Sequence, residues 1–163
     1  MTVSGPAVPG PDRPVLVLVG PHTDTDVEAA AGMPVAEIFL DRGEPVFRDL
    51  EREAVAAALA GHRGVLALGG GAVLDPGTQR LLAGHRVVFL DVGITDAARR
   101  IGFNRDRPLL LGNPRARWLN LMEARRPVYE QVSLARVDTD GRTPEEVARA
   151  VLDALGLVPE EMS

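Results

Sequence analysis

The stretch that decides the fold is Val65-Leu66-Ala67-Leu68-Gly69-Gly70-Gly71, four aliphatic residues followed by three glycines. A continuous apolar run of this length is typical of a strand covered on both faces, as in a parallel sheet between layers of helices. Ligands of such sheets bind at the carboxyl ends of the strands, where glycines let the backbone approach a ligand closely. The three glycines therefore indicate a binding loop. The simpler alternative is a flexible turn into the helix that starts at Asp75.

Three further apolar runs extend the predicted sheet, at residues 15–19, 87–90 and, more weakly, 135–137. Helical patterns lie between the runs, at residues 44–60, 75–83, 95–101, 115–132 and 143–155. Strands that alternate with helices predict an α/β fold, an open parallel sheet of four strands with helices on both faces. We expect one domain over residues 15–158, between tails at 1–14 and 159–163, with a lid loop at about 103–114.

The composition excludes several kinds of chemistry. All 18 basic residues are arginines, so a lysine Schiff base, a lysine general base and the lysine of a phosphate-binding loop are excluded. The chain has no cysteine, which excludes disulfides, thiolate nucleophiles and cysteine-ligated metals. The net charge of −5 argues against nucleic-acid binding, and no apolar run is long enough to span a membrane. The N-terminal tail has no apolar signal segment, so we expect a monomeric cytoplasmic protein.

A pair of aspartates could carry chemistry, since Asp24 and Asp26 flank a threonine. In an extended segment the two carboxylates share a face and would suit a hard cation together with a substrate hydroxyl. The alternative is an Asx turn or a cap for a following helix. Several arginines could bind a carboxylate or a phosphate through two parallel hydrogen bonds, but any one of them alone is most simply a surface charge. Only a converging set of arginines would indicate an anion site.

In this order and spacing, these features resemble shikimate kinase, a small P-loop phosphotransferase of aromatic amino-acid biosynthesis. The resemblance extends from Thr23 to about Leu157. The motifs that carry it are Asp24-Thr25-Asp26, Ile38-Phe39, Gly43-Glu44, Phe47-Arg48 with Glu51, Gly69 to Val73, Asn104 to Leu110, Arg125 with Pro127 and Tyr129, and Val137-Asp138-Thr139. It implies a P-loop kinase fold and transfer of the γ-phosphate of ATP, with Mg²⁺, to the 3-hydroxyl of shikimate.

The resemblance assigns roles at the reacting centre. Asp26 would hold the ring hydroxyl of shikimate and help to take its proton, while Asp24 would face magnesium. Arg107, in the lid, would reach the nucleotide phosphates during transfer. Arg100 and Arg142, with Pro144, would line the adenine.

The resemblance also assigns a site for the substrate carboxylate. Arg48, Arg125 and the backbone at Gly70 would bind it, and the flanking glycines, Gly69 and Gly71, belong to the same loop. Phe47 and Glu51 would support Arg48. The residue types agree with this reading, because planar guanidinium groups match a planar carboxylate.

One departure from the family is as specific as the match. A shikimate kinase carries, after its first strand, a glycine-rich loop that ends in Lys-Ser or Lys-Thr, then a helix and a second strand that ends at Asp-Thr-Asp. Here only residues 20–23 separate the first strand from Asp24. A crossover between parallel strands needs about a dozen residues or more. Loop, helix and strand are therefore missing, about twenty residues, and no lysine elsewhere can replace the one that is lost.

The departure leaves three explanations open. The segment was lost from the sequence as it stands, the protein is a family member that binds shikimate or another small anion without phosphorylating it, or the remaining site serves a different chemistry. The intact flanking motifs favour the first explanation. In each case we expect ATP turnover by this chain to be lost or very low, because the phosphate-binding amides and the lysine supply most of the electrostatic stabilisation of phosphoryl transfer.

Overall fold

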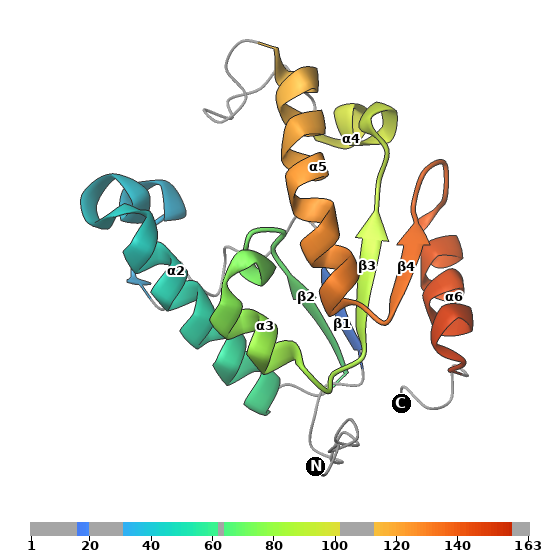
Figure 1. Cartoon of the computed structure of the whole chain (residues 1–163), viewed down its shortest axis with the longest axis horizontal. Helices are drawn as coiled ribbons and strands as arrows, with labels where there is room; N and C mark the ends of the chain where they lie inside the picture. Colours follow the sequence, from blue (N-terminus) through green and yellow to red (C-terminus); the bar gives the residue numbers. More distant parts are fainter. Residues whose placement is uncertain (1–15, 20–30, 62–63, 102–112, 158–163) are drawn as a thin grey trace, which may run out of the picture.

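The computed structural model describes residues 16–19, 31–61, 64–101 and 113–157. Its sheet has four strands: β1 (Leu16–Val19), β2 (Val65–Leu68), β3 (Val87–Asp91) and β4 (Ala135–Asp138). The strands lie in the order β2-β1-β3-β4 and every pairing is parallel (Figure 1). The predicted parallel α/β sheet is confirmed. The predicted tails, and the lid loop up to residue 112, lie outside the described residues.

The helices fall where the periodicity predicts them, with two additions, a short 3₁₀ helix and a helical stretch before Gly43. They are α2 (Val35–Gly61), the short 3₁₀ helix η1 (Ala72–Leu74), α3 (Pro76–Leu82), α4 (Ile94–Ile101), α5 (Pro114–Val132) and α6 (Pro144–Leu155). In α2, Gly43 has non-helical angles (φ 81°, ψ 166°) and separates the predicted helix from an earlier one that the sequence did not predict. Ile38 of the earlier helix and Phe47 of the later one pack together across this kink.

The two faces of the sheet carry separate cores. On one face, Leu66 and Leu68 of β2 and Phe89 of β3 pack with residues of α2, α3 and α5. On the other face, Val88 and Val137 pack against α6 through Val151. Helices therefore lie on both faces, as predicted, and α5 runs in front of the sheet, beside β3, in Figure 1.

The first crossover of the sheet has the opposite hand to the later ones. From β2 to β3, and from β3 to β4, the chain crosses the sheet in one direction through α3 and α5, which lie on one face (Figure 1). From β1 to β2 it crosses in the other direction, yet α2 packs on the same face through Val55 and Leu59. Crossovers that use one face in opposite directions have opposite hands. Because the β3-to-β4 crossover is right-handed in Figure 1, the β1-to-β2 crossover is left-handed, whereas about 98% of such crossovers are right-handed.

The helix that follows β4 begins at a complete cap. The side chain of Thr143 accepts a hydrogen bond from the backbone N–H of Glu146, and the Glu146 carboxylate accepts one from the Thr143 N–H. Pro144 stands at the first helical position, and Gly156 ends the helix in the left-handed conformation. The predicted start of α6 is confirmed, and the cap fixes this helix at the end of the sheet where β4 finishes.

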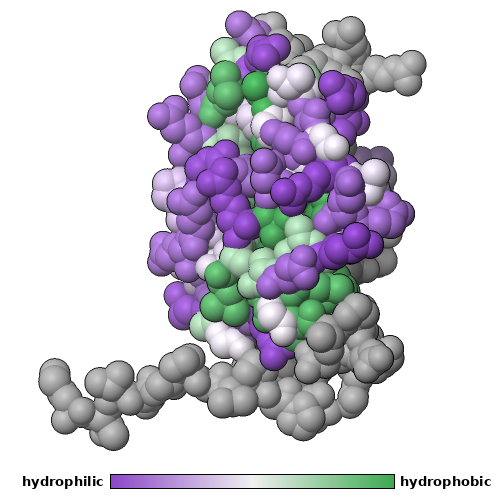
Figure 2. All heavy atoms as spheres, turned by 90° about the vertical axis from the view of Figure 1, so that its right-hand side faces the viewer, coloured by the Kyte–Doolittle hydropathy of each residue, from purple (hydrophilic) through white to green (hydrophobic). Residues whose placement is uncertain are grey.

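The side of the molecule formed by β4 and α6 is mostly polar. In Figure 2, hydrophilic residues cover most of this side, and hydrophobic residues show between them in its lower half. Within the described ranges, no helix is long and apolar enough to cross a membrane.

Candidate active site

The glycine loop at the end of β2 is closed into a tight turn. The backbone N–H of Ala72 donates to the carbonyl of Gly69 (3.0 Å), and that of Leu74 donates to the carbonyl of Gly71 (3.1 Å). Among the described residues, no partner is found for the N–H groups of Gly70 and Gly71. The loop therefore presents two consecutive backbone donors at the carboxyl end of a parallel strand, where such sheets bind their ligands.

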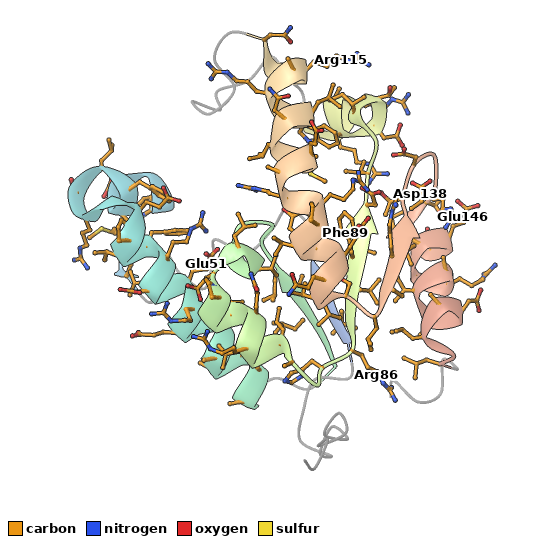
Figure 3. The ribbon with its side chains drawn as sticks, viewed as in Figure 1. Glu51, Arg86, Phe89, Arg115, Asp138 and Glu146 are labelled. Atoms are coloured by element: carbon orange, nitrogen blue, oxygen red, sulfur yellow. The ribbon has the colours of Figure 1, made fainter. Side chains whose placement is uncertain are left out.

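Arg48 lies flat against one of these glycines. A Cβ atom on Gly71 would stand 2.7 Å from Nη1 of Arg48 and 3.2 Å from its Cζ, so only glycine leaves room for the guanidinium. Nη1 donates to Oε2 of Glu51 at 2.6 Å, and Cζ lies 5.2 Å from the centre of the Phe47 ring. Glu51 is 6% exposed and Phe47 is 3% exposed. Figure 3 shows Glu51 on the side of α2 that faces η1 and α3. The expected support of Arg48 by these two residues is present.

Arg125 and Tyr129, one turn apart on α5, hold the other glycine. The hydroxyl of Tyr129 donates to the carbonyl of Gly70 at 2.8 Å. A Cβ atom on Gly70 would stand 2.8 Å from that hydroxyl and 3.8 Å from Nη1 of Arg125. The Nε atom of Arg125 is buried and has no hydrogen-bond partner among the described residues. A buried donor of a charged group without a partner is costly, and such groups are retained mainly where they serve a function.

Tyr129 is fixed by its surroundings. It is 4% exposed, and its ring packs on Phe89, with 4.9 Å between the ring centres. Phe89 lies behind α5 in Figure 3. Burial raises the pKa of the Tyr129 phenol, and the neighbouring Arg125 guanidinium counteracts part of that rise. The phenol is therefore protonated at neutral pH and can donate to Gly70.

Two guanidinium groups thus approach adjacent glycines, one from α2 and one from α5. Together with the N–H groups of Gly70 and Gly71, which have no partner in the described part of the chain, they form a positively charged donor set at the end of β2. Adjacent Cα atoms are about 3.8 Å apart, so both cations can reach one small anion. A carboxylate offers two oxygens in a plane and accepts such bidentate hydrogen bonds. We call Arg48, Gly70, Gly71 and Arg125 the carboxylate clamp.

The residues expected at the adenine line a single cavity on the other face of the sheet. Its volume is about 600 Å³, and Arg100, Arg142 and Pro144 all contribute to its wall. Arg100 is anchored there, because its guanidinium donates to the carbonyl of Thr139 (2.7 Å) and to the Thr139 hydroxyl (3.2 Å). The structure brings these three together at the carboxyl ends of β3 and β4.

The residues expected at the reacting centre cannot be placed. Asp24, Asp26 and Arg107 lie outside the described residues. Among the described residues, no group of three histidine or carboxylate side chains could hold a metal ion. The buried carboxylate at the end of β3, Asp91, is already bound by Arg126 and by Arg136 (2.6 Å). No step can be derived through a metal from these residues.

Sequence reasoning missed several partners in the site. Tyr129 was part of a motif without a role, and it proves to hold Gly70. Thr139 anchors Arg100 and donates its hydroxyl to the carbonyl of Asp91 at 2.9 Å. Asp91 in turn raises the pKa of Arg126 by accepting its hydrogen bonds, and so ties α5 to β3. The sequence could have pointed to these residues, because Asp91 and Thr139 are polar residues at the ends of predicted strands and Tyr129 lies one helical turn from Arg125.

The parallel sheet, the binding loop after one of its strands and the arginine-lined cavity on its other face are features of an α/β protein that binds small anionic ligands. Comparison with known proteins places the chain in the P-loop kinase class. The family model for shikimate kinase matches residues 21–156. The chain belongs to the shikimate kinase family.

Relatives at high identity agree with this assignment. Shikimate kinase of Streptomyces avermitilis is 60% identical over 135 residues, which cover 83% of this chain and 79% of that protein. Shikimate kinase of Streptomyces coelicolor is 52% identical over 165 positions, 88% of this chain and 96% of that protein. A solved shikimate kinase from Acinetobacter baumannii, in complex with shikimate, has a TM-score of 0.76 and 25% identity, over 88% of this chain and 93% of that chain. By close homology the activity is that of a shikimate kinase.

The longer alignment also shows a difference in length. Its 165 positions exceed the roughly 143 residues that make up 88% of this chain, so the Streptomyces coelicolor protein carries about 22 positions that this chain lacks. The family match begins at residue 21, directly after β1. Both observations agree with the loss of about one loop–helix–strand unit after the first strand.

Proposed function

We propose that this chain binds shikimate through its carboxylate, held by the carboxylate clamp, and that phosphoryl transfer by the chain as written is lost or very low. The observation that supports binding is the convergence of Arg48 and Arg125 on Gly71 and Gly70. The buried Nε of Arg125, which has no partner among the described residues, adds to it, because a protein retains such a costly arrangement mainly at a functional site.

Each element of the clamp has a separate task. Arg48, held by Glu51 and Phe47, pairs with one side of the carboxylate. Arg125 pairs with the other side from α5, and the N–H groups of Gly70 and Gly71 donate from below. Because Glu51 neutralises part of the charge on Arg48, the clamp does not hold two fully uncompensated cations together.

The remaining roles rest on the resemblance. Asp26 would orient the 3-hydroxyl of shikimate and accept its proton, Asp24 would face magnesium, and Arg107 would contact the phosphates. The adenine would lie in the cavity, against the wall formed by Arg100, Arg142 and Pro144. A cytoplasmic location and a monomeric state are part of the same proposal, and the lack of cysteine is compatible with a reducing compartment.

Transfer of the phosphoryl group needs more than the residues named above. In a P-loop kinase the backbone N–H groups and the lysine of the phosphate loop hold the β- and γ-phosphates while charge develops on them. This chain has no lysine and only residues 20–23 between β1 and Asp24. A shikimate site without that loop retains recognition and loses the main stabilisation of the transition state.

Calorimetric titrations with shikimate and with ATP, beside a coupled assay for ADP, test the proposal. The sample's mass must match the 163 residues. We expect saturable binding of shikimate and no turnover above background. Turnover at the rate of a complete relative assayed in parallel would refute the second half of the proposal, and absence of shikimate binding would refute the first.

A non-catalytic member of the family that binds shikimate or another small anion is the second candidate. The left-handed first crossover and the absence of lysine favour it over an active kinase. Heat with shikimate but none with ATP supports a binding protein. Heat with both supports an enzyme that holds the nucleotide without a phosphate loop.

A further inference from the structure

Strand β2 is covered on one face only. Leu66 and Leu68 point into the core shared with α2 and α3, and they are 9% and 2% exposed. On the opposite face of the same strand, Val65 is 41% exposed and Ala67 is also exposed. In parallel sheets strands are normally covered on both faces. An apolar strip therefore lies open on the face of the sheet to which α6 packs.

The open strip continues into the cavity already described. From Val65 on β2, the wall passes Leu90 on β3 and reaches the α6 residues Val147, Val151 and Leu152. Along α6 it extends from Pro144 to Leu152, about 12 Å at the rise of a helix. Arginines occur only at the end near Arg100 and Arg142, so most of the wall is aliphatic. We call this surface the sheet groove.

The left-handed β1-to-β2 crossover indicates which kind of element is missing from the groove. If the chain left β1 through a helix on the groove face and returned as a strand beyond β2, that crossover would be right-handed. From such an outer strand, α2 on its own face would lead back to β2, also with the right hand. One helix and one strand thus correct both the handedness and the exposure of Val65.

The additional residues of one relative match this size in total. About 22 positions of the Streptomyces coelicolor protein have no counterpart in this chain. A phosphate loop, a helix of about ten residues and a short strand need about that length. A helix of ten residues is about 15 Å long, close to the length of the groove along α6.

We propose that the sheet groove binds an amphipathic helix supplied in trans, as part of a loop–helix–strand segment of about 22 residues of the kind that relatives carry within their own chains. The helix lays its apolar face on Val65 and on the groove side of α6. The helix would occupy the aliphatic part of the groove, and the adenine would lie at its other end, beside Arg100 and Arg142. The carboxylate clamp lies outside the groove, at the carboxyl end of β2 between α2 and α5.

The test uses the whole chain and a synthetic peptide with the about 22 additional residues of the Streptomyces coelicolor protein. Calorimetry should show saturable binding with a stoichiometry of one. Far-UV circular dichroism should show more helix in the mixture than in the two components measured apart. A peptide of the same composition in scrambled order should not bind.

Two substitutions on one helix locate the contact. Ala148 and Ala154 are both exposed on α6, but only Ala148 lines the groove. Ala148→Glu should weaken peptide binding about 10-fold or more, since a charge would be buried unpaired, whereas Ala154→Glu should leave it unchanged. Val65→Asp should weaken binding to a similar degree, from the β2 side of the groove.

Three results would overturn the proposal. These are failure of the peptide to bind, equal binding of the scrambled peptide, and equal binding to the Ala148→Glu and Ala154→Glu variants. Without peptide, the molecular mass of the chain could rise with concentration, while the Val65→Asp variant stays monomeric. That result would show that a second copy of the chain occupies the groove instead. Shikimate binding is measured in the same samples, so a failure of the clamp is seen separately.

Discussion

At the scale of single residues, the site depends on Gly70 and Gly71. A side chain at either position would collide with a neighbouring group, the Tyr129 hydroxyl at Gly70 and the Arg48 guanidinium at Gly71. Neither Gly70 nor Gly71 has a positive φ angle, so their role is steric and not conformational. Resemblance to a family identified Arg48 and Arg125 as partners of this loop. The contact of Tyr129 with Gly70 spans 59 residues of sequence and only the fold reveals it.

Replacement of Gly71 tests the steric argument. In Gly71→Ala the new Cβ displaces the end of a flexible arginine, so we expect an intact fold and a loss of shikimate affinity. The loss should be about 10- to 100-fold, since charge-assisted hydrogen bonds contribute about 1.5–3 kcal/mol. Calorimetry measures the affinity, and thermal melting checks the fold.

Gly61→Ala is the matched control, because a Cβ on Gly61 at the end of α2 meets nothing within 4 Å. It should bind shikimate like the parent chain. Equal affinities for the two alanine variants would contradict the placement of Arg48.

Removal of one hydroxyl tests whether Tyr129 positions the loop. Tyr129→Phe keeps the ring on Phe89 and removes the hydrogen bond to Gly70, so unfolding should be easier by only about 1 kcal/mol. We expect shikimate to bind about 5- to 10-fold more weakly, while an analogue without the carboxylate is unaffected. Calorimetry with both ligands separates positioning of the clamp from a general loss of structure.

Ser133→Ala serves as the control, since the Ser133 hydroxyl is buried without a hydrogen-bond partner among the described residues. If Tyr129→Phe binds shikimate as Ser133→Ala does, the hydroxyl of Tyr129 has no part in recognition.

At the scale of elements, caps and cross-links place the helices that carry the site. Asp75 caps α3 by accepting from the backbone N–H of Thr78 at 2.7 Å, and it accepts from Arg52 of α2 at 3.2 Å. Periodicity and capping residues predicted α3, α5 and α6 to within a residue or two. The helix before Gly43 was missed because its apolar residues Ile38, Phe39 and Leu40 are consecutive, and such a run shows no helical periodicity.

Asp75 gives a pH dependence to the α2–α3 contact. The pKa of Asp75 is lowered from 3.8, first by the hydrogen bond from Thr78 and then by Arg52. A folded-state pKa below the unfolded value adds stability above about pH 4, and this is lost as the pH falls through the folded-state value. In Asp75→Asn, a capping side chain remains, and urea unfolding between about pH 5 and pH 3 should show a shallower loss of stability than in the parent.

Asp153→Asn, an exposed change on α6, should keep the parent's pH dependence. A parent-like fall in stability for Asp75→Asn would show that other carboxylates cause the acid sensitivity.

The capping box of α6 predicts a separate loss of stability. Thr143→Ala removes the acceptor for the Glu146 N–H and should lower the free energy of unfolding by about 1 kcal/mol. Thr95→Ala on α4, where the exposed side chain makes no hydrogen bond among the described residues, should change it by less than about 0.5 kcal/mol. Urea denaturation of both variants and the parent gives the comparison, and equal midpoints would refute the role of the cap.

At the scale of the whole molecule, the fold is a shikimate kinase sheet whose first crossover has lost its right-handed unit. Sequence alone indicated the loss, because too few residues separate the first strand from Asp24 and no lysine remains. It could not show the consequence, a left-handed crossover and an open face on β2, since both depend on which face α2 covers. The clamp lies on loops and helices that the loss does not touch.

The most direct test of this account is a calorimetric titration of shikimate into the chain with a verified mass of 163 residues, repeated with Arg125→Ala. Recognition that survives without the phosphate loop predicts one saturable site in the parent chain, weakened about 10-fold or more by the substitution. No heat of binding in a folded parent chain, or equal binding by the two proteins, would contradict it.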